Sequence, residues 1–242
     1  MNGWLRPDWA APANVRALVT TRQGGASRGG FAGFNLAGHV GDDAAAVALN
    51  RAALARELPA PPLWLDQVHG TVCVAAESTG ADATADACVA HRPGLVCAVL
   101  TADCLPVLLC DRDGGAVGVA HAGWRGLAAG VVESTVDAMR VPPDRLLAWL
   151  GPAIGPQAFE VGSEVREAFV ARSAAADAAF RSRGEGKWLC DLYLLARQRL
   201  AERGVAAVSG GGLCTYSDAA RFFSYRRDGR CGRMAALIWL DA

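Results

Sequence analysis

Residues 93–126 read PGLVCAVLTADCLPVLLCDRDGGAVGVAHAGWRG, and this stretch decides the fold. It contains three apolar runs, at 95–100, 105–110 and 116–121, and the polar residues TADC separate the first two. Runs of this length that are rich in Val and Leu and bounded by Asp and Gly are typical of buried strands. The Asp113–Gly114 pair between the second and third runs predicts a β-hairpin.

The hairpin brings a thiol close to an imidazole. A two-residue turn at Arg112–Asp113 would set Cys104 opposite His121, whereas a turn at Asp113–Gly114 would set Cys104 opposite Gly123. In both registers Cys104 and His121 lie on one face of the sheet, because side chains alternate along a strand. Facing β-carbons lie ~5 Å apart. We therefore expect the two side chains to be close enough to share a metal ion or a proton.

Length, charge and cysteine usage exclude several classes of protein. The 242 residues carry 24 basic and 24 acidic side chains, so the balance gives no reason to expect nucleic acid or an anionic membrane as partner. No apolar run is long enough to cross a bilayer, and the first residues do not resemble a signal peptide. The eight cysteines show no framework spacing. We expect reduced thiols in a cytoplasmic protein.

The rest of the chain alternates strands and helices, which predicts a mixed α/β fold in a single domain over 1–242. A strand from Val15 enters a glycine-rich loop that starts at Arg22, and an alanine-rich helix should extend to about Leu58. Residues 62–74 resemble two short strands broken at 69–70. A helix is expected after residue 126 and up to about residue 140, and further helices at 163–172 and 189–203. Further strands are expected at 205–208 and 233–239, and residues 145–155 are expected to be a strand that enters a Gly/Pro loop.

A third candidate ligand completes a possible metal site. His69, Cys104 and His121 supply two imidazoles and a thiolate, the donor types of a catalytic zinc that keeps one position open. No two of the three belong to one short motif, so the spacing alone leaves a second interpretation open. In that interpretation a buried thiol packs beside a core histidine and binds no metal.

Several longer motifs resemble one known family. They are QVHG (67–70), TADCLPV (101–107), HAGWRG (121–126), LGPAIG (150–155) and FSYRRD (223–228), together with TTRQGG (20–25) and NLAGHVGD (35–42). In this order they resemble the bacterial laccase-domain family. That family is also called multicopper polyphenol oxidase-like, and its members are described as zinc-dependent purine nucleoside phosphorylases. The resemblance extends over essentially the whole chain.

The resemblance implies a layered α/β domain related to a cysteine-hydrolase toxin fold, with zinc held at His69, Cys104 and His121 as the catalytic site. It implies phosphorolysis of adenosine, inosine and methylthioadenosine, and also adenosine deamination. The partners would be a small-molecule nucleoside and phosphate. Arg125, at a turn that opens a helix, is the leading candidate for binding an anion, together with the N–H groups of that helix. The other substrate-binding candidates are Arg22, Asn35, His39, Arg226 and Arg227.

Three other functions stay open. Four histidines without a His-x-His pair cannot supply a multicopper cluster, although copper could occupy the single site of a copper-binding polyphenol oxidoreductase. Cys104 could be the nucleophile of a hydrolase that edits peptidoglycan precursors, with His69 or His121 as its base. The chain could also store a metal or sense redox state. Asp103 is expected on the opposite face from Cys104 unless a bulge re-aims it. The physiological substrate and the oligomeric state remain open.

Overall fold

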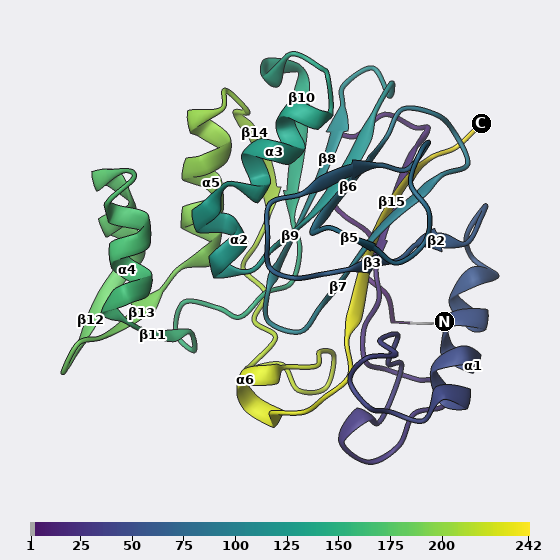
Figure 1. Ribbon diagram of the computed structural model, residues 1–242, viewed down its shortest axis with the longest axis horizontal. Coiled ribbons are helices and arrows are strands. Elements are labelled where there is room, and N and C mark those ends of the chain that lie inside the picture. Colours follow the sequence, from purple (N-terminus) through teal and green to yellow (C-terminus); the bar gives the residue numbers. More distant parts are fainter. Residues whose placement is uncertain (1–2) are drawn as a thin grey trace.

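The computed structural model describes residues 3–242, and its elements form four layers (Figure 1). A six-stranded sheet packs face to face on a four-stranded sheet, and helices cover the outer face of each. The expected mixed α/β architecture is confirmed. None of the helices in the described chain combines the length and apolarity that a membrane-spanning helix requires.

The six-stranded sheet carries most of the candidate site. In spatial order its strands are β14 (Ala207–Gly210), β10 (Leu146–Leu150), β8 (Leu105–Asp111), β9 (Val117–Ala122), β6 (Ala87–Ala90) and β4 (Cys73–Ala75). The outer pairs, β10 with β14 and β4 with β6, are parallel, and the inner pairs are antiparallel.

The four-stranded sheet consists of β1 (Val15–Val19), β15 (Met234–Leu240), β7 (Val96–Thr101) and β2 (Pro62–Leu63). Two smaller sheets complete the strands, β11 (Glu160–Gly162), β13 (Lys187–Cys190) and β12 (Phe180–Gly184) in one, and β3 (Leu65–Asp66) with β5 (Ala83–Thr84) in the other. The three-stranded sheet and α4 lie together at the left edge of Figure 1.

Alternation along the strands explains the layers. Along β8, Leu105, Val107 and Leu109 pack under the helices, whereas Leu108 and Cys110 pack between the two large sheets. Both faces of the strand are therefore buried, which accounts for its uninterrupted apolar sequence. The covering helices are α2 (Trp124–Ala129), α3 (Val131–Ala138) and α5 (Leu192–Glu202) on this sheet, and α1 (Ala44–Ala55) on the other.

Two helix predictions need correction. The helix expected up to about residue 140 is divided into α2 and α3 at Gly130, whose φ of 113° is a left-handed conformation that favours glycine. The helix expected from 189 begins instead at Leu192, because Lys187–Cys190 forms β13 and Asp191 caps the helix by accepting the N–H of Leu194. The remaining α-helices are α4 (Ser163–Val170) and α6 (Tyr225–Asp228), and short 3-10 helices lie at Gly29–Phe31, Pro143–Arg145 and Ala174–Ala179.

The hairpin register agrees with the second of the two predicted turns. Pro106 lies opposite His121 and Leu105 opposite Ala122, so Cys104 comes level with Gly123. The N–H of Asp111 bonds to the carbonyl of Ala116 at 2.9 Å, which leaves a turn of residues 112–115. The turn is longer than the expected two residues, but its even length keeps Cys104 and His121 on one face.

Candidate functional site

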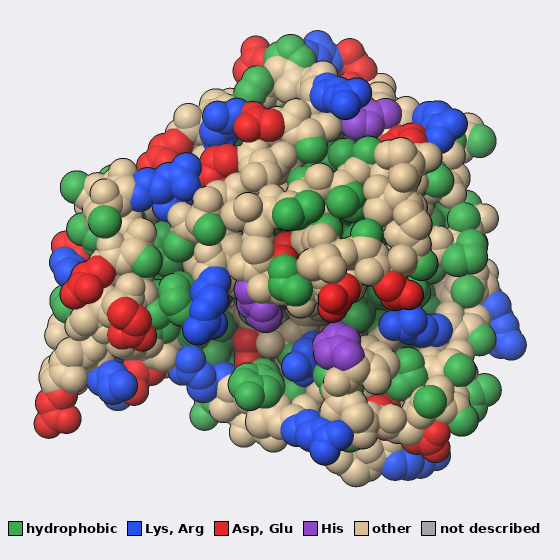
Figure 2. All heavy atoms as spheres, viewed as in Figure 1, with side chains coloured by type: hydrophobic (Ala, Val, Ile, Leu, Met, Phe, Trp, Pro, Cys, Tyr) green, Lys and Arg blue, Asp and Glu red, His purple; other side chains and the backbone are tan. Residues whose placement is uncertain are grey.

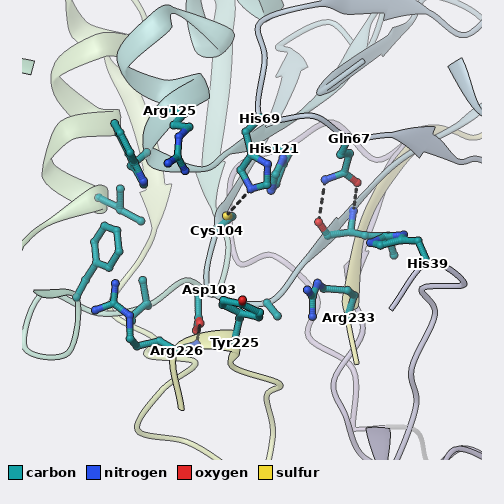
Figure 3. A pocket seen from close by; sticks show the side chains of 16 residues that line it. His39, Gln67, His69, Asp103, Cys104, His121, Arg125, Tyr225, Arg226 and Arg233 are labelled. Atoms are coloured by element: carbon teal, nitrogen blue, oxygen red, sulfur yellow. Dashed lines mark hydrogen bonds between the residues drawn. The ribbon is translucent and has the colours of Figure 1, made fainter. Parts of the chain in front are cut away.

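The three predicted ligands converge. The candidate ligand atoms of His69, Cys104 and His121 all lie within 4.8 Å of one another. Sγ of Cys104 is 3.8 Å from Nε2 of His69, and the two imidazole rings stand edge to face with centroids 4.8 Å apart (Figure 3). In residues 3–242 this is the one cluster of three or more His, Cys, Asp or Glu side chains that is close enough to hold a metal ion.

Each ligand comes from a different structural context. His121 lies in β9 and is 3% exposed, and Cys104 directly precedes β8. His69 is exposed and has a φ of 60°, in the loop between β3 and β4. A Cβ added to Gly123 would come within 2.9 Å of both Cys104 and His69, so only glycine leaves room for these two ligands to approach each other.

Asp86 orients both histidines, a role that the sequence analysis missed. Its buried carboxylate lies 2.8 Å from Nδ1 of His121 and accepts the backbone N–H groups of His69 and Gly70 at 2.9 and 2.6 Å. This contact places the Nδ1 proton of His121 on the carboxylate side and leaves Nε2 for the cluster. A carboxylate behind a ligating histidine is the usual arrangement in metal sites.

The electrostatics of the cluster favour a thiolate. Burial raises the pKa of Cys104, but the nearby His121 and His69 outweigh it and lower that pKa to about 6. Burial lowers the pKa of His121, while the Cys104 thiolate and Asp86 raise it to about 9. The thiolate, and not the thiol, is the form of cysteine that binds metal, so the lowered pKa of Cys104 favours metal binding.

The donor set fits a single metal ion that is borderline between hard and soft. Two imidazole nitrogens, one thiolate sulfur and an open side toward a cavity match a three-ligand zinc site. A multinuclear copper site would need more histidines, and of the other two only His39 lines the cavity. His91 lies elsewhere, with Nε2 3.1 Å from the carbonyl of Met139.

The cluster opens into a cavity of about 430 Å³. On the face shown in Figure 2, histidine side chains lie at a central hollow that has basic side chains around it. This volume is within the usual range for small-molecule sites. The side chains in Figure 3 belong to the lining residues, which are His39, Gln67, His69, Leu100, Ala102, Asp103, Cys104, His121, Trp124, Arg125, Ile154, Phe159, Leu192, Tyr225, Arg226 and Arg233.

Of the predicted substrate-binding residues, His39, Arg125 and Arg226 line this cavity. The Arg125 guanidinium stacks on Trp124 at 4.5 Å, and among residues 3–242 it makes no ion pair and no hydrogen bond. One edge of Arg226 is already used, because its Nη1 donates to the carbonyl of Glu160 at 2.7 Å. Arg125 is thus the freer of the two cations.

The other three predicted residues do not line the cavity. Asn35 is fully buried, and its amide bonds to Ala37 and Asp42 and to the N–H of Arg233. The guanidinium of Arg227 donates to the carbonyls of three residues, Thr215, Tyr216 and Phe222. Arg22 lies over the ring of Phe223 at 4.8 Å. These contacts support the loops around the cavity, and substrate contact by these residues remains a prediction.

Asp103 differs from the regular-strand expectation. Its φ is 88°, and β8 begins two residues later, so the backbone turns its carboxylate toward the cavity side. The carboxylate accepts the hydroxyls of Thr215 and Ser224 at 2.6 and 3.1 Å, and the N–H of Arg226 at 2.7 Å. It therefore ties the loop wall that includes α6 to the segment that carries Cys104.

Comparisons with known proteins assign the chain to a family. The family described as multi-copper polyphenol oxidoreductase laccase matches residues 16–241. A purine nucleoside phosphorylase of Pseudomonas aeruginosa is 58% identical over 242 residues and aligns over the full length of both chains. The purine nucleoside phosphorylase YfiH of Escherichia coli is 53% identical, over 99% of this chain and 100% of that protein.

Solved structures give the same result. A Neisseria meningitidis protein superimposes with a TM-score of 0.98 at 52% identity over 100% of both chains. YlmD from Geobacillus stearothermophilus gives a TM-score of 0.88 at 32% identity, over 99% of this chain and 97% of that one. The resemblance inferred from the motifs is confirmed: the chain belongs to the laccase-like family described as multi-copper polyphenol oxidoreductases, whose curated relatives are named purine nucleoside phosphorylases.

Proposed function

We propose that this chain is a zinc-dependent purine nucleoside phosphorylase acting on adenosine, inosine and methylthioadenosine, with adenosine deaminase activity at the same site. The observation that carries the proposal is one cavity that joins the His69, Cys104 and His121 cluster to the free cation of Arg125. The names of relatives more than 50% identical to the chain support an enzyme of this kind. We further propose one cytoplasmic domain over 1–242.

The metal site would consist of His69, Cys104 and His121. Zinc held there would supply a Lewis acid to the cavity, which can polarise a nitrogen of the departing purine. The role of the chain is to fix the ligands, since Asp86 holds His121 through Nδ1 and holds the 69–70 backbone. Orientation of this kind reduces the reorganisation that the site must undergo during reaction.

Arg125 is the proposed phosphate ligand. Cleavage of a glycosidic bond develops positive charge on the ribose, so an anion held nearby stabilises the transition state. The guanidinium presents a planar set of donors that suits phosphate oxygens, and stacking on Trp124 limits the conformations it must give up. The sequence analysis also assigned helix N–H groups to this anion. Because α2 has only six residues, the proposal relies on the side chain.

Two observations on Cys104 favour a second function. The lowered pKa of Cys104 and its 3.8 Å approach to His69 are also what a nucleophilic cysteine hydrolase requires. Metal content separates the two functions, because a zinc-bound thiolate is a poor free nucleophile. Native mass spectrometry of gently purified protein should show about one zinc per chain. Metal-free protein with an alkylatable Cys104 would favour the hydrolase.

Chromatography of adenosine tests the phosphorylase directly. Wild type and Cys104→Ala are incubated with adenosine, with and without phosphate. We expect adenine and ribose 1-phosphate from wild type only, and only with phosphate, together with slower formation of inosine. Adenine release that is independent of phosphate, or that survives in Cys104→Ala, would contradict the proposed reaction.

A further inference from the structure

Tyr225 is an exposed aromatic side chain inside the cavity. It is 60% exposed although it lines the same cavity as the metal cluster. Among residues 3–242 few large apolar side chains are this exposed, and of them only Tyr225 lines the cavity, which indicates a binding role. Figure 3 shows the ring on the opposite side of the cavity from His69 and His121.

The other two large aromatic side chains of the cavity are less available. Phe159 is 8% exposed and lies under the guanidinium of Arg226 at 5.2 Å. Trp124 is half-buried and carries the guanidinium of Arg125 at 4.5 Å. Tyr225 has a guanidinium near it as well, from Arg233 at 5.8 Å, but its larger exposure leaves ring surface open to a ligand.

The backbone of Tyr225 is fixed on both sides by one buried carboxylate. Asp103 accepts the hydroxyl of Ser224, the preceding residue, at 3.1 Å and the N–H of Arg226, the following residue, at 2.7 Å. The Ser224 hydroxyl in turn accepts the N–H of Arg227 as the cap of α6. A ring on a backbone held in this way loses little conformational entropy when a flat ligand packs on it.

We propose that Tyr225 binds the purine base by stacking, and that Asp103 positions it. The assignment rests on the proposed function and names the residue that recognises its base. A purine presents a flat π-surface, for which an open aromatic ring is the matching partner. Removal of the ring should weaken base binding about 5- to 150-fold, which corresponds to the ~1–3 kcal/mol typical of one base–aromatic stack.

Calorimetry on the zinc-loaded protein tests the stack without turnover. The two probes are hypoxanthine and ribose 1-phosphate, titrated separately into wild type, Tyr225→Phe and Tyr225→Ala. We expect Tyr225→Ala to lose affinity for hypoxanthine by the stated factor and to keep its affinity for ribose 1-phosphate. Tyr225→Phe should stay within about threefold of wild type for both, because the aromatic face is retained.

A matched control is Tyr216→Ala, which removes the neighbouring exposed tyrosine, 39% exposed, from the same wall but outside the cavity lining. It should leave both affinities unchanged. Loss of ribose 1-phosphate affinity in Tyr225→Ala, or unchanged hypoxanthine affinity, would overturn the stacking assignment even if wild type cleaves adenosine. Wild type that binds hypoxanthine through Tyr225 but never cleaves adenosine would instead refute the proposed function alone.

Discussion

Nδ1 of His121 lies 2.8 Å from the carboxylate of Asp86, and both side chains are buried. The same carboxylate accepts the N–H groups of His69 and Gly70, so one acidic residue orients two of the three candidate ligands. Hydrogen bonds to an ionised acceptor are stronger than those between neutral groups. The geometry of the cluster therefore depends on a residue that would not contact the metal itself.

Replacement of Asp86 by Asn should weaken zinc binding. The amide keeps one acceptor but turns an NH₂ group toward donors that the carboxylate satisfied, and it removes the charge behind His121. We expect a 10- to 100-fold lower zinc affinity, the usual effect of losing such a partner. Competition with a chelator measures it. Asp82→Asn is the control, since Asp82 is exposed and lies outside the cluster. Equal affinities in wild type and Asp86→Asn would contradict the orienting role.

Zinc should also stabilise the fold. A ligand that binds only the native state adds about 2.7 kcal/mol when its free concentration is 100 times its Kd. For a chain of this length that corresponds to a rise in Tm of about 5–11 °C. Thermal unfolding with buffered free zinc, compared with chelated protein, provides the measurement. Cys104→Ala lacks one ligand and should show little of this shift, and a full shift in that variant would place the zinc elsewhere.

The sequence predicted the centre of the fold because the signals there are local and redundant. The strands β7, β8 and β9 are continuous apolar runs, and the even-length turn between β8 and β9 sets Cys104 and His121 on one face. Asp86 could not be predicted in this way. Its position depends on the long-range pairing of Ala87 in β6 with Ala120 in β9, which brings Asp86 next to His121.

Polar loop residues show a second limit of prediction from sequence. Asn35, in a family motif, is predicted from sequence to bind substrate, and in the structure its amide hydrogen-bonds to Ala37, Asp42 and Arg233. A buried loop must satisfy its own backbone groups, and asparagine is well suited to do so. From sequence alone, a polar residue that supports the backbone is indistinguishable from one that faces a ligand. Tyr225 was not predicted as a site residue, because the packing of α6 sets the exposure of its ring and the sequence does not show that packing.

Arg125→Ala should weaken the use of phosphate. Its guanidinium makes no ion pair with any residue from 3 to 242, so an anion meets a cation that has no competing partner. We expect the apparent KM for phosphate to rise about tenfold, the lower end for a hydrogen bond to a charged group, because Arg125 is exposed. Initial rates against phosphate concentration measure it. Arg92→Ala, an exposed arginine outside the cavity, is the control, and a wild-type phosphate KM in Arg125→Ala would remove the assignment.

Acid should loosen the wall that carries Tyr225. Hydrogen bonds from Arg227 lower the pKa of Asp228, which also lies 3.8 Å from Arg22. Because the folded-state pKa lies below the unfolded value of about 3.9, this contribution is present above that value and is lost as the pH falls through the folded one. Urea unfolding between pH 7 and pH 3 measures the free energy of unfolding of wild type and Asp228→Asn. Wild type should have the higher value at pH 7, and the difference should shrink toward pH 3. A constant difference between them would contradict the ion pair's role.

Asp103→Asn should affect the wall of the cavity more than the metal site. The Asp103 carboxylate accepts three hydrogen bonds, from Thr215, Ser224 and the N–H of Arg226. An amide cannot accept on its nitrogen, so in either orientation at least one donor loses its partner. We expect a loss of about 2 kcal/mol in the free energy of unfolding, typical for hydrogen bonds to a charged group. The KM for adenosine should rise more than the zinc affinity falls.

The coupling between Asp103 and Tyr225 distinguishes positioning from general destabilisation. If Asp103 acts on the base through Tyr225, Asp103→Asn should weaken hypoxanthine binding in wild type but add little in the Tyr225→Ala background. Thr215→Val serves as the matched control, because it removes one bond to Asp103 and leaves the two that flank Tyr225. It should destabilise the fold and spare hypoxanthine binding. Fully additive effects of Asp103→Asn and Tyr225→Ala would show that the carboxylate acts on the cavity by another route.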